Sequence, residues 1–214
     1  MQPHTEHRPL VFMRLFIALD IDDAIREKIR VFLEGVRGFA PDARWVRSES
    51  LHVTLKFVGE KPAQTADAIT SALAKVAASP FELSFRGYGF FPTPKSARVF
   101  WMGIQSGPEL AGLAATIDSA TATLGIPNED RAFSPHLTLA RRGGGSGSPR
   151  WSKADSPNKT FERLSEKLAA MSSLDFGTMT AREFFLYQSQ LSGEGSRYTK
   201  LEAFPLRENS SHVP

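Results

Sequence analysis

Cysteine is absent from this sequence of 214 residues. Its absence excludes disulfides, thiolate metal ligands and cysteine nucleophiles, and it makes a cytoplasmic location the expectation. Long apolar runs are also absent, because none reaches the roughly 20 residues that a bilayer span needs. The stretch Leu10–Leu19 is interrupted by Arg14 and lacks the cleavage site of a secretory signal. We therefore expect no membrane partner and interpret this stretch as a buried strand.

A large excess of one charge is missing too. The chain has 26 basic and 23 acidic residues, although its sequence pI is about 9.3. A basic pI is compatible with an anionic partner and equally with an ordinary surface. With 41% hydrophobic residues, the chain can build a substantial core. We expect a single domain of two lobes over residues 11–206, a monomeric state, and flexible ends at 1–10 and 207–214.

Apolar patterning predicts alternating strands and helices along the folded part. Strands are predicted at 11–19, 51–58, 81–91, 98–104 and 135–140, and helices at 22–36, 62–78, 108–124 and 161–171. The chain is predicted to close with a hairpin of strands 180–191 and 197–205 around Ser192-Gly193-Glu194-Gly195. Residues 143–158 are rich in Gly, Ser and Pro, which predicts a flexible loop.

An internal repeat runs through these elements. His52-Val53-Thr54-Leu55 recurs as His136-Leu137-Thr138-Leu139, at an offset of 136 − 52 = 84 residues. The same offset relates Arg14 to Arg98 and Phe16 to Phe100, and it relates the helices that follow them. One long duplication of strand, helix and strand indicates two lobes related by an approximate two-fold axis.

Each copy of the repeat offers an imidazole and a hydroxyl on one face of a strand, because residues i and i+2 project together. His52 and His136 are also the two histidines of the five that lie between the expected flexible ends. If the two-fold axis brings the strands together, one neutral imidazole can accept a proton from water while the other, protonated, donates to a leaving oxygen. Thr54 and Thr138 would donate to phosphate oxygens. A strained cyclic phosphodiester is a fitting substrate for such a pair.

The motifs allow two other interpretations, a structural histidine and a zinc site. A single His-x-Thr would more often be a packed histidine near a sheet edge, but two copies in matching context favour a shared site. Zinc is the second alternative, and catalytic zinc usually takes three protein ligands. The strand neighbours Lys56 and Ala140 add none, so we expect neither metal nor cofactor.

The residues resemble a known family at several points. The chain resembles the two-histidine (2H) phosphoesterase superfamily, specifically the RNA 2′,3′-cyclic phosphodiesterases also described as 2′-5′ RNA ligases (LigT). The resemblance extends from about Met13 to Leu206 and includes the segments Met13–Leu19, Trp45–Glu60, Phe91–Pro94, Arg98–Trp101, Ser134–Arg141, Leu186–Ser189 and Arg197–Leu206. It implies an α+β fold of two lobes, each an antiparallel sheet backed by helices, around a central cleft.

The resemblance also implies roles for individual residues. His52 is implied to donate a proton, His136 to accept one from water, and Thr54 and Thr138 to hold the phosphate. RNA ending in a 2′,3′-cyclic phosphate would be opened to a 2′-phosphate, with a secondary 2′-5′ ligation of RNA ends such as tRNA halves.

Phe57 and Arg141 lie five positions after their histidines, at family positions suited to base stacking and to phosphate contact. Strict alternation would instead place both on the core side, unless a bulge re-aims them. A core aromatic is an equal interpretation of Phe57. Arg141 requires a phosphate or carboxylate partner, because an unpaired buried charge is costly. By the same alternation, Lys56 would share the histidine face.

Two questions stay open at this level. The loop 143–158 brings basic residues and Trp151 close to the second motif, which suits single-stranded nucleic acid but equally an ordinary surface loop. The alternatives to an RNA-end phosphodiesterase are a phosphodiesterase for another small cyclic or 2′-5′-linked nucleotide and a non-catalytic RNA-end binding module. The second alternative needs no acid–base pair, so both intact motifs count against it.

Overall fold

The structure, a computed structural model, describes residues 11–143, 159–171, 173–192 and 195–207. The expected flexible ends, apart from Arg207, and the predicted loop, apart from Gly143, lie outside these residues. The strands are β1 (Phe12–Leu19), β2 (Ala43–Trp45), β3 (Val53–Pro62), β4 (Phe81–Phe91), β5 (Val99–Ser106), β6 (His136–Arg142), β7 (Asp175–Ala181), β8 (Glu183–Ser192) and β9 (Gly195–Pro205). The α-helices are α1 (Asp23–Val36), α2 (Ala63–Leu73), α3 (Pro108–Ala122) and α4 (Glu162–Ala169).

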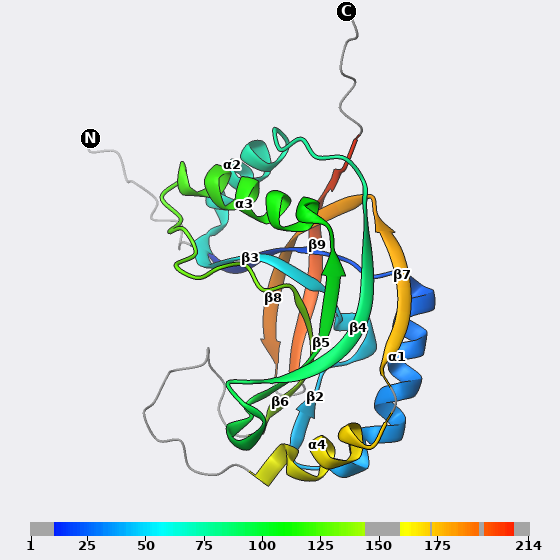
Figure 1. Cartoon of the computed structure of the whole chain (residues 1–214). Coiled ribbons are helices and arrows are strands. Elements are labelled where there is room, and N and C mark those ends of the chain that lie inside the picture. Colours follow the sequence, from blue (N-terminus) through cyan, green and yellow to red (C-terminus); the bar gives the residue numbers. More distant parts are fainter. Residues whose placement is uncertain (1–10, 144–158, 172, 193–194, 208–214) are drawn as a thin grey trace, which may run out of the picture.

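Two antiparallel sheets form the body of the molecule (Figure 1). One has four strands in the order β3-β1-β8-β9, and the other has five in the order β2-β6-β5-β4-β7. Strands β3 and β6, which begin at the two histidine motifs, lie side by side where the sheets adjoin. This α+β arrangement of two sheets and flanking helices is the fold class that the sequence predicted.

The predicted elements are present, with differences at their ends. The second helix ends at Leu73 rather than at residue 78, and β3 continues to Pro62. The predicted closing hairpin is confirmed as the pair β8 and β9. Its first strand was placed too early, because Thr180 belongs to β7 in the five-stranded sheet, and β8 begins at Glu183 in the other. Strand β2 was not predicted, because its three residues are too few to show a period.

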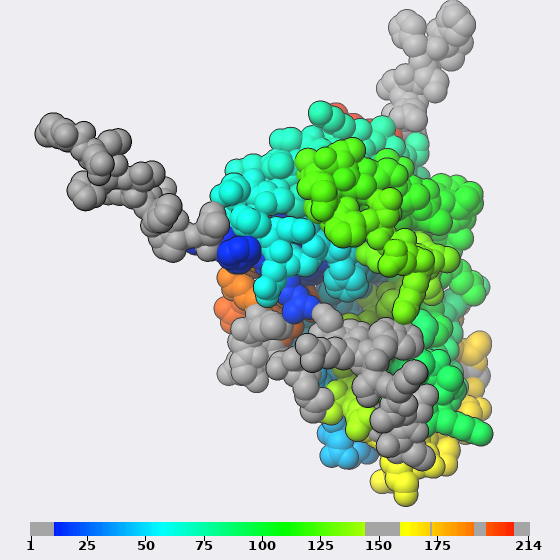
Figure 2. Space-filling view, turned by 90° about the vertical axis from the view of Figure 1, so that its left-hand side faces the viewer, coloured from blue at the N-terminus to red at the C-terminus, as the bar shows by residue number. Residues whose placement is uncertain are grey.

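The helices are exchanged between the two halves of the repeat. Helix α1 follows β1 of the four-stranded sheet but packs on β7 of the five-stranded sheet, where Phe32 meets Phe176 edge-on at 5.2 Å between ring centroids. Helix α3 follows β5 of the five-stranded sheet but packs against β3 of the other. Helices α2 and α3 lie side by side at one end of the molecule (Figure 2). This exchange ties the two halves into one body.

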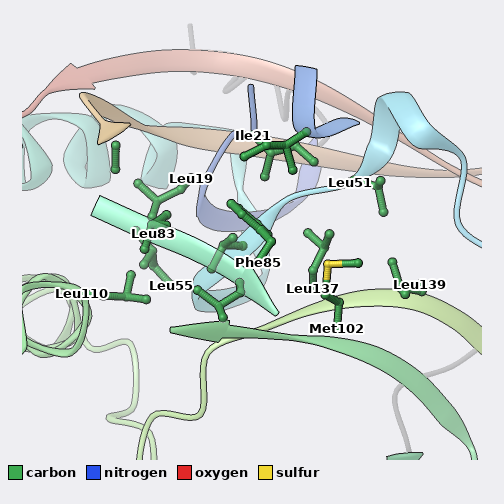
Figure 3. Packing of buried hydrophobic residues seen from close by; sticks show 14 of the residues in the cluster. Leu19, Ile21, Leu51, Leu55, Leu83, Phe85, Met102, Leu110, Leu137 and Leu139 are labelled. Carbon is green, nitrogen blue, oxygen red and sulfur yellow. The ribbon is translucent and has the colours of Figure 1, made fainter. Parts of the chain in front are cut away.

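The hydrophobic core lies between the sheets and their helices and draws on both halves. Leucines from the two motif strands converge on side chains of β1, β4 and β5 (Figure 3). Leu19, Phe85, Met102 and Leu137 are fully enclosed there. Burial of each such side chain contributes about 1.5–3 kcal/mol, so the motif strands are held firmly in place. Within the described part of the chain, no helix is long and apolar enough to cross a membrane.

The strand register confirms the equivalence of the two motif strands and corrects the equivalence of the strands that precede them. Strand β3 pairs with β1 and β6 with β5 in the same pattern, and both pairings contain a bulge at the fourth motif residue, Leu55 or Leu139. Thr54 therefore corresponds to Thr138 at an offset of 84, but Ala18, the partner of Thr54, corresponds to Trp101 at an offset of 101 − 18 = 83. The predicted equivalence of Phe16 with Phe100 was thus wrong by one residue.

Candidate active site

The two histidines are held in the same way. His52 Nδ1 lies 2.8 Å from the carbonyl oxygen of Ser50, and His136 Nδ1 lies 2.8 Å from the carbonyl oxygen of Ser134. A carbonyl only accepts, so each Nδ1 carries the hydrogen and donates it. In both neutral rings Nε2 is then the basic nitrogen, which is the atom left to exchange protons with a substrate.

The two imidazoles stand at the start of adjoining strands. His52 directly precedes β3, His136 begins β6, and β3 and β6 adjoin. Besides burial, the positive charge of Arg141 lowers the pKa of both histidines, and the charge of His136 lowers the pKa of His52. The structure therefore brings together the two histidines that the repeat singled out.

Burial favours the neutral form of both histidines in the free protein. Burial is the largest cause in each case, and it lowers the pKa of His52 to about 4 and also lowers the pKa of His136. The hydrogen bonds to the carbonyl oxygens of Ser50 and Ser134 raise these pKa values, and the negative charge of Asp20 raises that of His52, but burial outweighs them. An anion bound between the rings would favour their protonated forms.

Aromatic rings enclose each histidine, and none of them was predicted to line the site. Phe16, Tyr198 and Tyr187 surround His52 at ring-centroid distances of 4.7, 5.1 and 6.2 Å. A signal for this wall exists in the sequence, because Phe16 lies between Leu15 and Ile17 and makes both faces of β1 apolar.

His136 has a smaller aromatic wall. Phe91 and Trp101 lie at ring-centroid distances of 5.3 and 6.3 Å from it. The Trp101 ring occupies the place where a side chain at residue 89 would stand, since a Cβ there would lie 2.1 Å from it. Gly89 thus makes room for the wall beside His136.

The bulges decide where Phe57 and Arg141 point. The extra residue places two successive buried residues in each strand, Leu55-Lys56 and Leu139-Ala140, and thereby shifts the alternation by one. Phe57 is 60% exposed and lies near Phe16 on the histidine side, so its interpretation as a core aromatic was wrong. Arg141 is turned outward by the same shift.

Arg141 is exposed, and neighbouring side chains shield its guanidinium from part of the solvent. Burial lowers the pKa of its guanidinium, the positive charges of Arg44 and Arg14 lower it further, and Tyr198 opposes them. Among the described residues no carboxylate pairs with it, although arginine remains charged at neutral pH. Among the residues that the structure describes, the hydroxyls of Thr54 and Thr138 also have no hydrogen-bond partner. All three groups are therefore able to donate hydrogen bonds to an incoming anion.

Lys56 does not share the histidine face. It is 2% exposed, because the bulge turns it toward α3, where its Nζ donates to Asp118 and to the carbonyl oxygen of Pro127 at 2.6 Å. The predicted alternation failed here for the same reason that Phe57 is exposed.

A hollow of about 220 Å³ adjoins His52, between Ser50, Tyr187 and Tyr198. Asp20 and Lys200 close one side of it and also line a larger hollow of about 430 Å³. They form an ion pair at 2.5 Å, and Asp20 also binds Arg26 at 2.5 Å. Burial raises the pKa of Asp20, but hydrogen bonds from Lys200 and the Ile21 amide, with the two positive charges, lower it below its usual value.

The described residues contain no group of three or more histidine, aspartate or glutamate side chains arranged to hold a metal ion. The chemistry that the site offers is therefore that of two imidazoles, two hydroxyls and a guanidinium beside aromatic walls.

Comparison with known proteins agrees with this site. The LigT like Phosphoesterase family matches residues 19–101 and 103–198. The chain is 36% identical over 192 residues to an RNA 2′,3′-cyclic phosphodiesterase of Archaeoglobus fulgidus, covering 90% of this chain and 99% of that protein. A protein of the same name from Methanothermobacter thermautotrophicus is 30% identical over 198 residues, covering 91% and 99%.

Solved structures show the same fold. The crystal structure of E. coli LigT complexed with 3′-AMP aligns with a TM-score of 0.71 at 28% identity, covering 92% of this chain and 99% of that one. A crystal structure of the same protein complexed with phosphate aligns with a TM-score of 0.66 at 27% identity, covering 92% and 99%. In sequence and in fold, this chain belongs to the LigT-like family of 2H phosphoesterases.

Proposed function

We propose that this protein hydrolyses RNA 2′,3′-cyclic phosphate ends to 2′-phosphates by paired-histidine acid–base catalysis. The observation that carries the proposal is the convergence of His52 and His136, each with Nδ1 bound to a carbonyl and Nε2 left for proton transfer. The names of the relatives from Archaeoglobus and Methanothermobacter support the substrate class.

The reaction divides the two histidines between the two sides of phosphorus. Neutral His136 accepts a proton from water, whose oxygen attacks phosphorus as the bond from phosphorus to the ribose 3′-oxygen breaks. His52, protonated, gives its proton to that 3′-oxygen, and the phosphate stays on the 2′-oxygen. Thr54, Thr138 and Arg141 hold the other phosphate oxygens and stabilise the charge that develops on them.

This division requires His52 to become protonated before it can act. Its pKa of about 4 without substrate favours the neutral ring. The negative phosphate, bound beside it, raises that pKa, and Asp20 acts in the same direction. Substrate binding thus prepares the acid. A 2′-5′ ligation would use the same proton transfers, with the 5′-hydroxyl of a second RNA attacking phosphorus in place of water and the 3′-oxygen leaving, and we regard it as secondary.

The arginines around Arg141 favour an RNA end over a small cyclic nucleotide. Arg44 stands opposite Arg141 across β2 and β6, and Arg14 lies two residues from Phe16 on the same face of β1. Both lie near enough to lower the pKa of Arg141. A mononucleotide brings one phosphate to this site, whereas an oligonucleotide brings further phosphates that Arg14 and Arg44 can neutralise.

We expect the double variant Arg14→Gln, Arg44→Gln to raise KM for a cyclic-phosphate oligoribonucleotide about tenfold and to reduce the salt dependence of its binding by roughly one unit of log–log slope. Turnover of a mononucleoside 2′,3′-cyclic phosphate should change little. Arg163→Gln, on the exposed face of α4, serves as the charge-matched control. Equal losses on both substrates would favour the small-nucleotide alternative.

The proposed activity is tested with purified protein and an oligoribonucleotide that ends in a 2′,3′-cyclic phosphate. We expect ring opening to a 2′-phosphate, located by its phosphorus NMR signal, at the same rate with and without EDTA, because the residues of the site supply both acid and base. A 3′-phosphate product would contradict the assignment of the leaving oxygen. Loss of turnover in EDTA, restored by a divalent ion, would contradict the metal-free mechanism.

A further inference from the structure

Lys56 is a buried cation beside the proposed active site, and the reaction described above does not use it. Its side chain is 1% exposed, although lysine is rarely enclosed without partners. Its Nζ donates to Asp118 of α3 and to the carbonyl oxygen of Pro127, and Glu129 lies 3.7 Å away. All donors of this ammonium are thus directed at α3 and at the segment that follows it.

The same carboxylate fastens this segment a second time. Asp118 accepts a hydrogen bond from the backbone amide of Glu129, at 3.2 Å to one of its oxygens. Residues 127–135 have no regular secondary structure and are mostly exposed. They end at His136, and the carbonyl oxygen that orients its ring belongs to Ser134. Lys56 and Asp118 therefore anchor the start of the segment whose end orients His136.

The first motif has a corresponding anchor. Arg26 of α1 donates to the carbonyl oxygen of Ser48 at 2.5 Å and to that of Ile21 at 3.1 Å, and it binds Asp20. Ser48 begins the short turn that ends at Ser50, whose carbonyl oxygen orients His52. In each half a largely enclosed cation thus holds the irregular segment directly before the histidine. Lys56 differs because it comes from the strand of the other histidine.

We propose that Lys56 is a positioning residue that fixes His136 relative to His52, by tying β3 to the segment before β6. The proposal rests on the proposed function, since it assigns the pair a shared reaction. An in-line displacement needs both imidazoles aligned on one phosphorus atom, and a misplacement of about 1 Å can cost about a hundredfold in rate. A lysine that leaves the motif strand next to the bulge and reaches the other half is well placed to hold that alignment.

The test compares Lys56→Met, which keeps the length of the side chain and removes its donors, with Lys56→Gln, which keeps a donor. Glu129→Gln is the matched control, because Glu129 is exposed and its contact with Lys56 is the longest of the three. Asp118→Asn provides a second way to weaken the anchor if the Met variant does not fold. We expect kcat on the cyclic-phosphate oligonucleotide to fall tenfold or more in Lys56→Met, with KM within about twofold, and part of the loss to return in Lys56→Gln.

Proton NMR titration of the folded variants separates this role from general weakening and from the proposed function. We expect the His136 resonance to shift and its pKa to change in Lys56→Met and Asp118→Asn, with His52 nearly unchanged. An unchanged His136 signal, or equal displacement of both histidines, would overturn the positioning role. Absence of wild-type turnover would instead contradict the proposed function and leave the NMR result as the measure of Lys56.

Discussion

Replacing His52 or His136 with alanine is expected to lower kcat/KM by about 10³-fold, because each variant lacks one of the two groups that move protons in the reaction. The fold should persist, since neither side chain belongs to the buried core cluster. Rates are measured on the cyclic-phosphate oligonucleotide, and thermal unfolding by circular dichroism checks the fold. A variant with near wild-type turnover would remove that histidine from the mechanism.

The pH dependence of the wild-type enzyme belongs to the same prediction. A bell-shaped profile is expected, bounded by two macroscopic titrations of the histidine pair. Burial lowers both pKa values in the free enzyme, so the optimum of kcat/KM should lie on the acid side of the usual imidazole value of about 6.5. Bound phosphate raises both pKa values, so the optimum of kcat should lie at higher pH. Identical optima would contradict the proposed effect of substrate binding.

Arg141→Gln is expected to lower kcat/KM by about 10²-fold, because the variant loses the positive charge that faces the phosphate. Its second effect has a definite sign. The charge of Arg141 lowers the pKa of both histidines, so its removal should raise the pKa of His52 and of His136. Proton NMR titration of the free enzyme measures this shift without reference to turnover.

Arg142→Gln is the matched control for Arg141→Gln. Arg142 is the next residue of the same strand and is exposed, and its charge is not among the causes of either histidine shift. It should leave both titrations and the rate nearly unchanged. If Arg141→Gln moves neither histidine pKa, the two imidazoles and the guanidinium do not share one site.

The histidine pair could be found from the residues because its signal is local. A His-x-Thr motif on an apolar strand shows its pattern within four residues, and its recurrence at a constant offset shows the duplication. The strands that carry the motifs, and helices α1 and α3 after the first strand of each half, follow from the same periodicity. Even the scarcity of histidine between the chain ends helped, since it left few candidates for the base.

The surroundings of the pair depended on features that the one-dimensional pattern does not contain. A bulge adds one residue to a strand without changing its composition, so alternation placed Lys56, Phe57 and Arg141 on the wrong faces. The switch from β7 to β8 between the sheets leaves no mark in the pattern either, because a single residue, Arg182, separates the two strands.

His52 and His136, with their neighbouring threonines, could therefore be predicted from the sequence alone, since strand periodicity acts over a few positions. The closeness of the two rings and their lowered pKa values arise only when β3 and β6 adjoin. The anchoring of residues 127–129 by Lys56 arises only when α3 packs against β3. Such properties depend on burial and on charges from distant parts of the chain, and these are set by how the two sheets pack together.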